Sequence, residues 1–167
     1  QVAKMLGARV IGTCSTPEKA ELVRKAGADD VILYSGHDFL TKVQSLTNNH
    51  GVDVVYDSVG KATWENSLHC LRPRGMLVFF GNASGPVPLF DPLLLSKHGS
   101  LFVTRPSLNH YVATRDELEK RSADLFSWTA TGKLNVHIGE TLALAEAAEA
   151  QQRLASSKTS GKVLLLP

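Results

Sequence analysis

Short runs of β-branched and other apolar residues alternate along the chain with stretches whose apolar positions recur every three to four residues. The short runs predict strands, and the longer stretches predict amphipathic helices. The predicted strands are residues 9–13, 31–34, 52–56, 76–80, 101–104 and 162–166. The predicted helices are residues 1–6, 17–26, 38–46, 62–71, 92–96, 115–131 and 144–154. This alternation predicts an α/β fold with a doubly wound parallel sheet covered by helices.

Local signals define several helix ends. Thr16 followed by Pro17 is typical of a helix start, and Gly27 is typical of the end of that helix. Thr114 and Glu117 have the spacing of a capping box at the start of the long helix. Residues 72–75, with the sequence Arg-Pro-Arg-Gly, predict a turn between a helix and the next strand.

The alternation weakens near residues 132–139, which indicates a domain boundary there. We expect one domain over residues 1–133 and a second segment over residues 134–167. The first predicted helix starts at Gln1 without an N-cap residue, so we expect the chain to be part of a longer protein.

Composition narrows the class of protein. The chain has 167 residues, 43% of them hydrophobic and 20% charged, which is typical of a soluble globular protein. Its formal net charge of +2 predicts no strong attraction to nucleic acid. No apolar run approaches the roughly 18–20 residues that span a bilayer. Two cysteines cannot form a disulfide framework, which fits a reducing compartment.

In doubly wound sheets, ligands bind where the strands end, so the residues after each strand are the first candidates for a site. Ser15, Thr16 and Lys19 follow the first predicted strand, where an NAD-type domain normally has an acidic residue. Two hydroxyls, a lysine and a helix N-terminus suit the 2′-phosphate of NADP. The equal alternative is that Ser15 and Thr16 only cap the helix and that Lys19 only faces water. Tyr34 lies at the end of the next predicted strand. It is either an adenine-side contact or a half-buried aromatic residue at the sheet edge.

Two further strand ends carry candidates. Ser58 and Gly60 follow the most hydrophobic strand, and Gly60 would permit a ligand to approach the backbone closely. Phe80, Gly81 and Asn82 follow the next strand, and Asn82 could bind a carboxamide. Both segments are also ordinary turn formers. Because three strand ends carry candidates together, we favour the functional interpretation.

Other chemistries have weaker signals. The six histidines, His37, His50, His69, His98, His110 and His137, lack metal-ligand spacing. We interpret Cys14 as a small buried residue at a strand end more readily than as a reactive thiol. The sequence has neither a serine nucleophile elbow nor a pair of carboxylates that would indicate hydrolysis.

Three motifs carry a closer resemblance. The runs VVYDSVG (54–60), FGNASG (80–85) and VTRPSL (103–108) resemble the zinc-independent NADPH:quinone oxidoreductases of the medium-chain dehydrogenase/reductase superfamily, the group that includes zeta-crystallin. The resemblance extends over essentially the whole chain. It implies the C-terminal half of a two-domain subunit: a Rossmann sheet without its first strand, and a last segment that completes a GroES-like catalytic domain.

The resemblance also implies roles for individual residues. Ser15, Thr16 and Lys19 resemble the 2′-phosphate site, Tyr34 an adenine-side contact and Ser58 a ribose-side contact. The segments expected along the nicotinamide half of NADPH are Phe80, Gly81, Asn82 and Ala83, then Val103, Thr104 and Arg105. The implied reaction is hydride transfer from NADPH to a quinone without a metal, in which the protein positions two planar molecules. We therefore assign no catalytic residue.

Two alternatives remain open at this point. One is a related enoyl or alkenal reductase, which would keep the NADPH site and change the substrate pocket. The other is a non-enzymatic role, as a crystallin-like or RNA-binding protein. We also expect the fragment alone to be inactive, since the first strand and its glycine turn lie outside the sequence.

The resemblance finally implies partners and a compartment. Family members commonly dimerise by joining Rossmann sheets edge to edge, and residues 101–104 are the candidate edge strand. We expect a cytoplasmic homodimer that binds no membrane and no nucleic acid, with an organelle still open as its location.

Overall fold

The computed structural model describes residues 1–34, 39–156 and 159–167. Contacts within the chain divide it into two compact units. One consists of Arg9–Leu118, and the other combines Gln1–Ala8 with Glu119–Pro167. The domain boundary expected between residues 133 and 134 stays a prediction.

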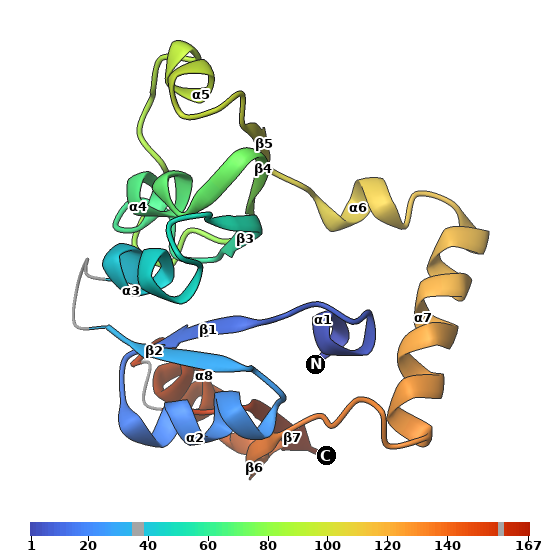
Figure 1. Ribbon diagram of the computed structural model, residues 1–167. Coiled ribbons are helices and arrows are strands. Elements are labelled where there is room, and N and C mark those ends of the chain that lie inside the picture. Colours follow the sequence, from blue (N-terminus) through green and yellow to red (C-terminus); the bar gives the residue numbers. More distant parts are fainter. Residues whose placement is uncertain (35–38, 157–158) are drawn as a thin grey trace. The chain divides into compact units, whose positions relative to one another are not determined.

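The unit Arg9–Leu118 contains two parallel sheets (Figure 1). β1 (Ile11–Cys14) pairs with β2 (Asp30–Leu33), from Ile11 opposite Asp30 to Cys14 opposite Leu33. The second sheet has the order β3-β4-β5. Its strands are β3 (Val52–Asp57), β4 (Leu71–Phe79) and β5 (Phe102–Thr104). All of these pairs are parallel, which confirms the predicted fold class.

Helices join the strands, as the alternating pattern predicts. The helices of this unit are α2 (Pro17–Lys25), α3 (Phe39–Leu46), α4 (Trp64–His69), α5 (Leu93–Lys97) and α6 (Leu108–Tyr111). Residue 38, the predicted start of α3, lies outside the described residues. The short helix α6 was not predicted, since four residues show no helical period.

α2 shows why the local signals were reliable. Thr16 is its N-cap with extended backbone angles, and Pro17 occupies the first turn. Gly27 follows the helix with a φ of +102°, a conformation that L-residues rarely adopt. The predicted start and stop signals are therefore confirmed.

The prediction for residues 71–75 was wrong. They form the first half of β4 and not a helix end and turn. Their pairing with β3 is irregular, because Val52 lies opposite Leu71 while Val54 lies opposite Met76. The extra residues on β4 make a bulge, which accommodates Pro73 and the positive φ of Arg74 (+61°).

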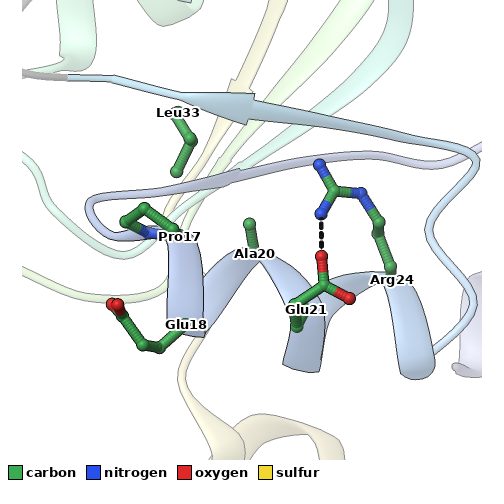
Figure 2. Close-up of a pocket in the computed structure, with 6 residues that line it drawn as sticks. All are labelled: Pro17, Glu18, Ala20, Glu21, Arg24 and Leu33. Carbon is green, nitrogen blue, oxygen red and sulfur yellow. Dashed lines mark hydrogen bonds and ion pairs between the residues drawn. The ribbon is translucent and has the colours of Figure 1, made fainter.

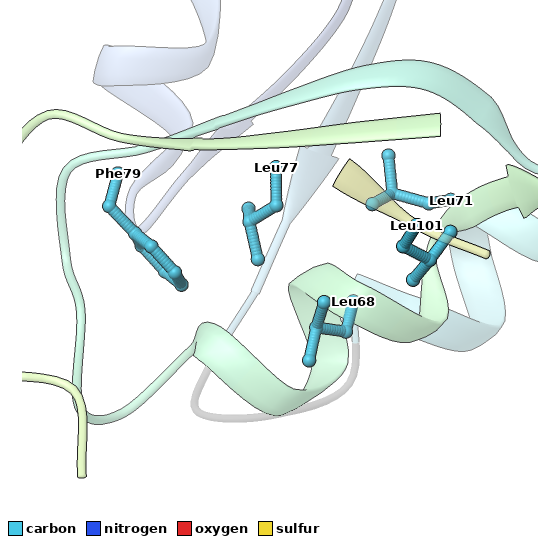
Figure 3. Close-up of a cluster of buried hydrophobic side chains, with 5 residues drawn as sticks. All are labelled: Leu68, Leu71, Leu77, Phe79 and Leu101. Carbon is cyan, nitrogen blue, oxygen red and sulfur yellow. The ribbon is translucent and has the colours of Figure 1, made fainter. Parts of the chain in front are cut away.

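Two apolar clusters hold the sheets and helices of this unit together. Figure 3 shows the first, which joins α4, β4 and the residue before β5 and consists of Leu68, Leu71, Leu77, Phe79 and Leu101. The second consists of Ile32, Phe39, Val43 and Cys70. Ile11, Val52 and Val55 pack against this second cluster, so it connects β1 and β2 with β3. Burial of these side chains holds the two sheets together within this unit.

The other unit has a smaller parallel sheet of β6 (Ile138–Ala143) and β7 (Lys162–Leu166). The turn η1 (Leu144–Glu146) and α8 (Ala147–Ala155) connect these two strands. α1 (Val2–Met5) belongs to the same unit, and the Gln1 amide exchanges hydrogen bonds with the backbone of Asn135 at 2.9 and 2.7 Å. α7 (Arg115–Ala130) runs from one unit into the other. β6 was not predicted, because Gly139, Glu140 and Thr141 interrupt its apolar residues.

Candidate functional site

The ends of β1 and β2 bring the first group of candidate residues together. Cys14 and Leu33 are opposite each other in the last pair of the ladder, and the Tyr34 N–H donates to the Cys14 carbonyl at 3.0 Å. Ser15 is exposed directly after β1. Thr16 and Lys19 begin α2, so all four candidates lie at one end of this sheet.

Thr16 acts as a helix cap. Its Oγ1 accepts a hydrogen bond from the Lys19 N–H at 3.3 Å, which satisfies one of the free amides of the first turn. Thr16 therefore caps α2, and its contact with a 2′-phosphate stays a prediction. The Lys19 ammonium group has no hydrogen bond or ion pair with any residue that the structure describes, so its charge remains available.

Glu18 is a residue of this site that the sequence analysis missed. The pKa of its fully exposed carboxyl is lowered, first by a hydrogen bond from its own backbone amide and then by the Thr16 hydroxyl. Glu18 belongs to the N-terminal turn of α2, whose free amides favour a negative charge. An acidic residue two positions after the N-cap is the sequence signal that could have indicated it.

Tyr34 is half-buried, and its ring packs edge-to-face on Phe39, with ring centroids 6.0 Å apart. The ring also packs against the second apolar cluster. This is the ordinary packing of an aromatic residue at a strand end, and a contact with adenine stays a prediction.

A groove of about 390 Å³ lies along α2. Figure 2 shows its lining, with Leu33 facing Pro17 and Ala20 while an ion pair joins Glu21 and Arg24. Glu18 completes the lining. None of the predicted site residues lines this groove, and its acidic groups do not suit a phosphate. We assign no ligand to it.

The ends of β3, β4 and β5 bring the second group together. Asp57 is opposite Phe79, and Val78 is opposite Thr104. Residues 58–63 and residues 80–85, which we call the paired loops, follow β3 and β4. Their backbones are joined by hydrogen bonds: Phe80 N–H to Asp57 O (2.9 Å), Ala83 N–H to Ser58 O (3.1 Å), Ser84 N–H to Val59 O (2.8 Å) and Lys61 N–H to Gly85 O (3.1 Å).

Two glycines allow this close approach. A β-carbon on Gly81 would lie 2.9 Å from Ser58 Cα, closer than real contacts permit. A β-carbon on Gly60, whose φ is +84°, would lie 2.6 Å from the carbonyl oxygen of Gly85. Gly60 therefore allows a close approach of the protein backbone, and the approach of a ligand to it stays a prediction. Ser58, Asn82 and Ala83 remain exposed on the outside of the paired loops.

Asp57 supports the first of the paired loops from inside. Its side chain is 4% exposed, and Oδ1 accepts from the N–H groups of Val59 (2.8 Å) and Gly60 (2.9 Å). Oδ2 accepts from the hydroxyls of Thr63 and Ser67, both at 2.8 Å. The sequence analysis missed this role. An Asp that ends a buried strand before Ser-x-Gly, with hydroxyl residues six and ten positions later, is the signal that could have found it.

The end of β5 adds Thr104 and Arg105. Arg105 donates to the Phe79 carbonyl at 2.9 Å, which ties the end of β5 to that of β4 beside Phe80. The Phe80 ring is 55% exposed, so it is free to meet a ligand. The Val103 side chain is partly buried against the first apolar cluster, and its contact with the nicotinamide half stays a prediction.

Both cysteines are buried and free. Cys14 is 8% exposed at the end of β1, as the sequence analysis favoured, and burial raises the pKa of Cys70 to about 12. Over residues 1–34, 39–156 and 159–167, no three His, Cys, Asp or Glu side chains are grouped to hold a metal ion. Within the same ranges, no helix has both the length and the apolar character that a bilayer span requires.

Comparison with known proteins gives a consistent assignment. Residues 1–127 match the family model described as zinc-binding dehydrogenase. A quinone oxidoreductase of Pseudomonas aeruginosa is 48% identical over 167 residues, which are 100% of this chain and 51% of that protein. A 2-haloacrylate reductase of a Burkholderia species is 47% identical, over 99% of this chain and 50% of its own length.

Among solved structures, Escherichia coli quinone oxidoreductase complexed with NADPH matches 99% of this chain with a TM-score of 0.94 and 45% identity. The match covers 52% of that structure. The chain thus spans about half the length of the relatives that it matches.

Proposed function

Because the chain belongs to the zinc-binding dehydrogenase family, in the medium-chain dehydrogenase/reductase superfamily, we propose that it supplies most of the NADPH-binding domain of a quinone reductase. The observation that carries this proposal is the similarity, at a TM-score of 0.94, to a quinone oxidoreductase complexed with NADPH. The strand ends described above support it, because they gather the predicted contacts at the edges where such sheets bind ligands.

The residues present fit two parts of the cofactor. At the end of β1, the uncommitted charge of Lys19 suits the 2′-phosphate, with the exposed hydroxyl of Ser15 beside it. At the ends of β3 to β5, Ser58, Asn82 and Ala83 lie exposed on loops whose backbones are already hydrogen-bonded to each other. Such a surface binds a nucleotide without first having to become ordered.

NADPH, when bound, supplies the hydride that reduces the quinone. This chain's residues bind and orient it. The Arg105 side chain joins the ends of β4 and β5 through the Phe79 carbonyl, which positions the backbone of Phe80 for a contact with the nicotinamide half. For the zinc named in the family description, the described residues offer no group of three ligands, so we assign no zinc site here.

We also propose that the protein forms a homodimer through β5. This strand lies at the edge of its sheet in the order β3-β4-β5, and its residue Phe102 is 56% exposed. An exposed edge strand offers unpaired backbone groups to a second copy.

The cofactor proposal is tested by measuring NADPH and NADH affinities by calorimetry on the protein purified from its full coding sequence. Wild type should prefer NADPH, and Lys19→Ala should remove about 1–3 kcal/mol of that preference, the size of a charge-assisted hydrogen bond. Lys25→Ala, at the other end of α2, is the matched control and should leave the preference unchanged. If neither nucleotide binds, the proposal is wrong.

The substrate is tested by following NADPH oxidation with a soluble quinone and, separately, with an activated alkene such as a 2-haloacrylate. We expect turnover of the quinone. Turnover of the alkene alone would overturn the quinone assignment while leaving the cofactor assignment in place.

A further inference from the structure

Ser84 makes more hydrogen bonds between the paired loops than any other described residue of these loops. Its N–H donates to the Val59 carbonyl at 2.8 Å, and its hydroxyl donates to the same carbonyl at 2.7 Å. The hydroxyl oxygen also accepts from the Ala62 N–H at 2.9 Å. Residues 59 and 62 lie 25 and 22 positions away in sequence, so Ser84 connects two loops that are remote along the chain.

Only a group that both donates and accepts can make the two side-chain bonds. A serine hydroxyl does so, whereas alanine does neither. Ala62 precedes α4 and has no helical carbonyl to accept its N–H, so the Ser84 oxygen provides that acceptor. Ser84 is nevertheless exposed and does not belong to either apolar cluster. Removing its hydroxyl would leave no cavity in the core.

The turn that Ser84 holds carries Asn82 and Ala83. The Gly85 N–H closes this turn by donating to the Asn82 carbonyl at 3.0 Å. On the other side of the turn, Gly81 lies against Ser58. The Asn82 Oδ1 lies 3.4 Å from the position that a β-carbon on Gly60 would occupy, so the amide side chain lies over the first loop. Fixing both ends of residues 82–83 fixes what those residues present to a ligand.

We propose that Ser84 is a positioning residue for cofactor binding: its hydroxyl holds the turn that presents Asn82 and Ala83 to the nicotinamide half of the nucleotide. This inference rests on the proposed function. Ser84 acts through its neighbours and contributes no chemistry of its own. Because Ser84 is exposed, we expect its loss to lower the melting temperature only slightly and to appear mainly in nucleotide affinity.

The test uses four single variants and one double variant of the protein purified from its full coding sequence, with NADPH dissociation constants measured by calorimetry and melting temperatures measured alongside. Ser84→Ala should weaken NADPH binding about five- to tenfold, the order expected for one or two lost neutral hydrogen bonds. Ser84→Thr keeps the hydroxyl and should bind within twofold of wild type. Ser45→Ala, an exposed serine of α3 whose side chain has no hydrogen bond to a described residue, should be unchanged.

The fourth variant, Asn82→Ala, tests whether Ser84 acts through the turn. The double variant Asn82→Ala/Ser84→Ala should lose no more affinity than the single variant with the larger loss, because the effects of residues that act as a unit do not add. Additive losses would overturn the proposal. So would wild-type affinity in Ser84→Ala, or equal losses in Ser84→Ala and Ser84→Thr with lowered melting temperatures.

Failure of the proposed function has a different signature. If the wild-type protein itself binds no NADPH, the proposed function and this inference both fall. If wild type binds NADPH and Ser84→Ala binds it equally well, only the inference falls.

Discussion

The hydroxyl of Ser67 donates a hydrogen bond of 2.8 Å to the carboxylate of Asp57, which lies ten residues earlier at the end of β3. Both side chains are almost fully buried, at 2% and 4% exposure. The bond ties α4 to the strand end, while the other carboxylate oxygen orders the loop that begins with Ser58. One side chain therefore couples the interior of the unit to its candidate site.

Replacing Asp57 by Ala should lower the free energy of unfolding by about 3 kcal/mol or more. Four donors lose their acceptor, and a buried group left unpaired costs about 1–3 kcal/mol. Denaturant titration measures the loss. Asp53→Ala is the matched control, since Asp53 is 79% exposed and its ion pair with Arg72 should be worth at most about 1 kcal/mol. Equal losses in the two variants would contradict the role given to Asp57.

Replacing Gly81 by Ala should separate the paired loops. The new β-carbon meets the backbone of Ser58, which cannot move aside as a flexible side chain could. We expect a loss of about 2 kcal/mol or more in stability and weaker NADPH binding. Gly7→Ala is the control, because its β-carbon would meet nothing and only its φ of +82° adds a cost, of about 1 kcal/mol. Unchanged nucleotide affinity in Gly81→Ala would argue against a site at the paired loops.

Cys70 should make the protein less stable in alkali. Burial raises its pKa from 9.0 to about 12, so the unfolded state loses this proton at a lower pH than the folded state. The contribution of the protonated Cys70 thiol to the free energy of unfolding is complete below about pH 9 and is lost as the pH rises towards 12. Denaturant titrations at several pH values should show a fall for wild type over this range that is shallower in Cys70→Ala. Identical pH dependence in both proteins would contradict the prediction.

Replacing Glu18 by Gln should strengthen the preference for NADPH over NADH by a few-fold. The lowered pKa keeps this carboxyl charged at neutral pH, and its negative charge lies in the turn that contains Lys19. Removing that charge lowers the electrostatic repulsion of a phosphate. Calorimetry with both nucleotides measures the change, and Glu21→Gln, one turn further along α2, should change it less. A weaker preference in Glu18→Gln would show that the 2′-phosphate binds elsewhere.

The sequence predicted the elements that local chemistry determines. Thr16, Pro17 and Gly27 define α2 within a residue or two, and Thr114 and Glu117 form the capping box at the start of α7, with both bonds present at 3.2 and 3.1 Å. Each signal depends on residues within one turn of the chain. The fold class was also predictable, since it follows from the alternation of periods.

Tertiary context decided what could not be predicted. Arg72-Pro73-Arg74-Gly75 is typical of a turn, yet pairing with β3 makes it the bulged start of β4. The apolar residues of β6 are interrupted by Gly139, Glu140 and Thr141, and the segment becomes a strand through its pairing with β7. In the site, Ser15 and Lys19 were predicted from their place after a strand. The side-chain hydrogen bonds of Ser84 span 22 and 25 residues, and no local pattern indicates such partners. The partners of Asp57 lie within ten residues, and their pattern could have indicated its role.

The hydrogen bonds between residues 57–62 and 80–85 also have a dynamic consequence. Loops usually open independently and at low free-energy cost. Here the Val59 carbonyl accepts twice from Ser84, and the Lys61 N–H is bonded to Gly85, so neither loop can open without breaking bonds to the other. The amide protons of Lys61, Ala83 and Ser84 should therefore exchange with solvent at closely similar rates, as members of a single cooperative opening unit.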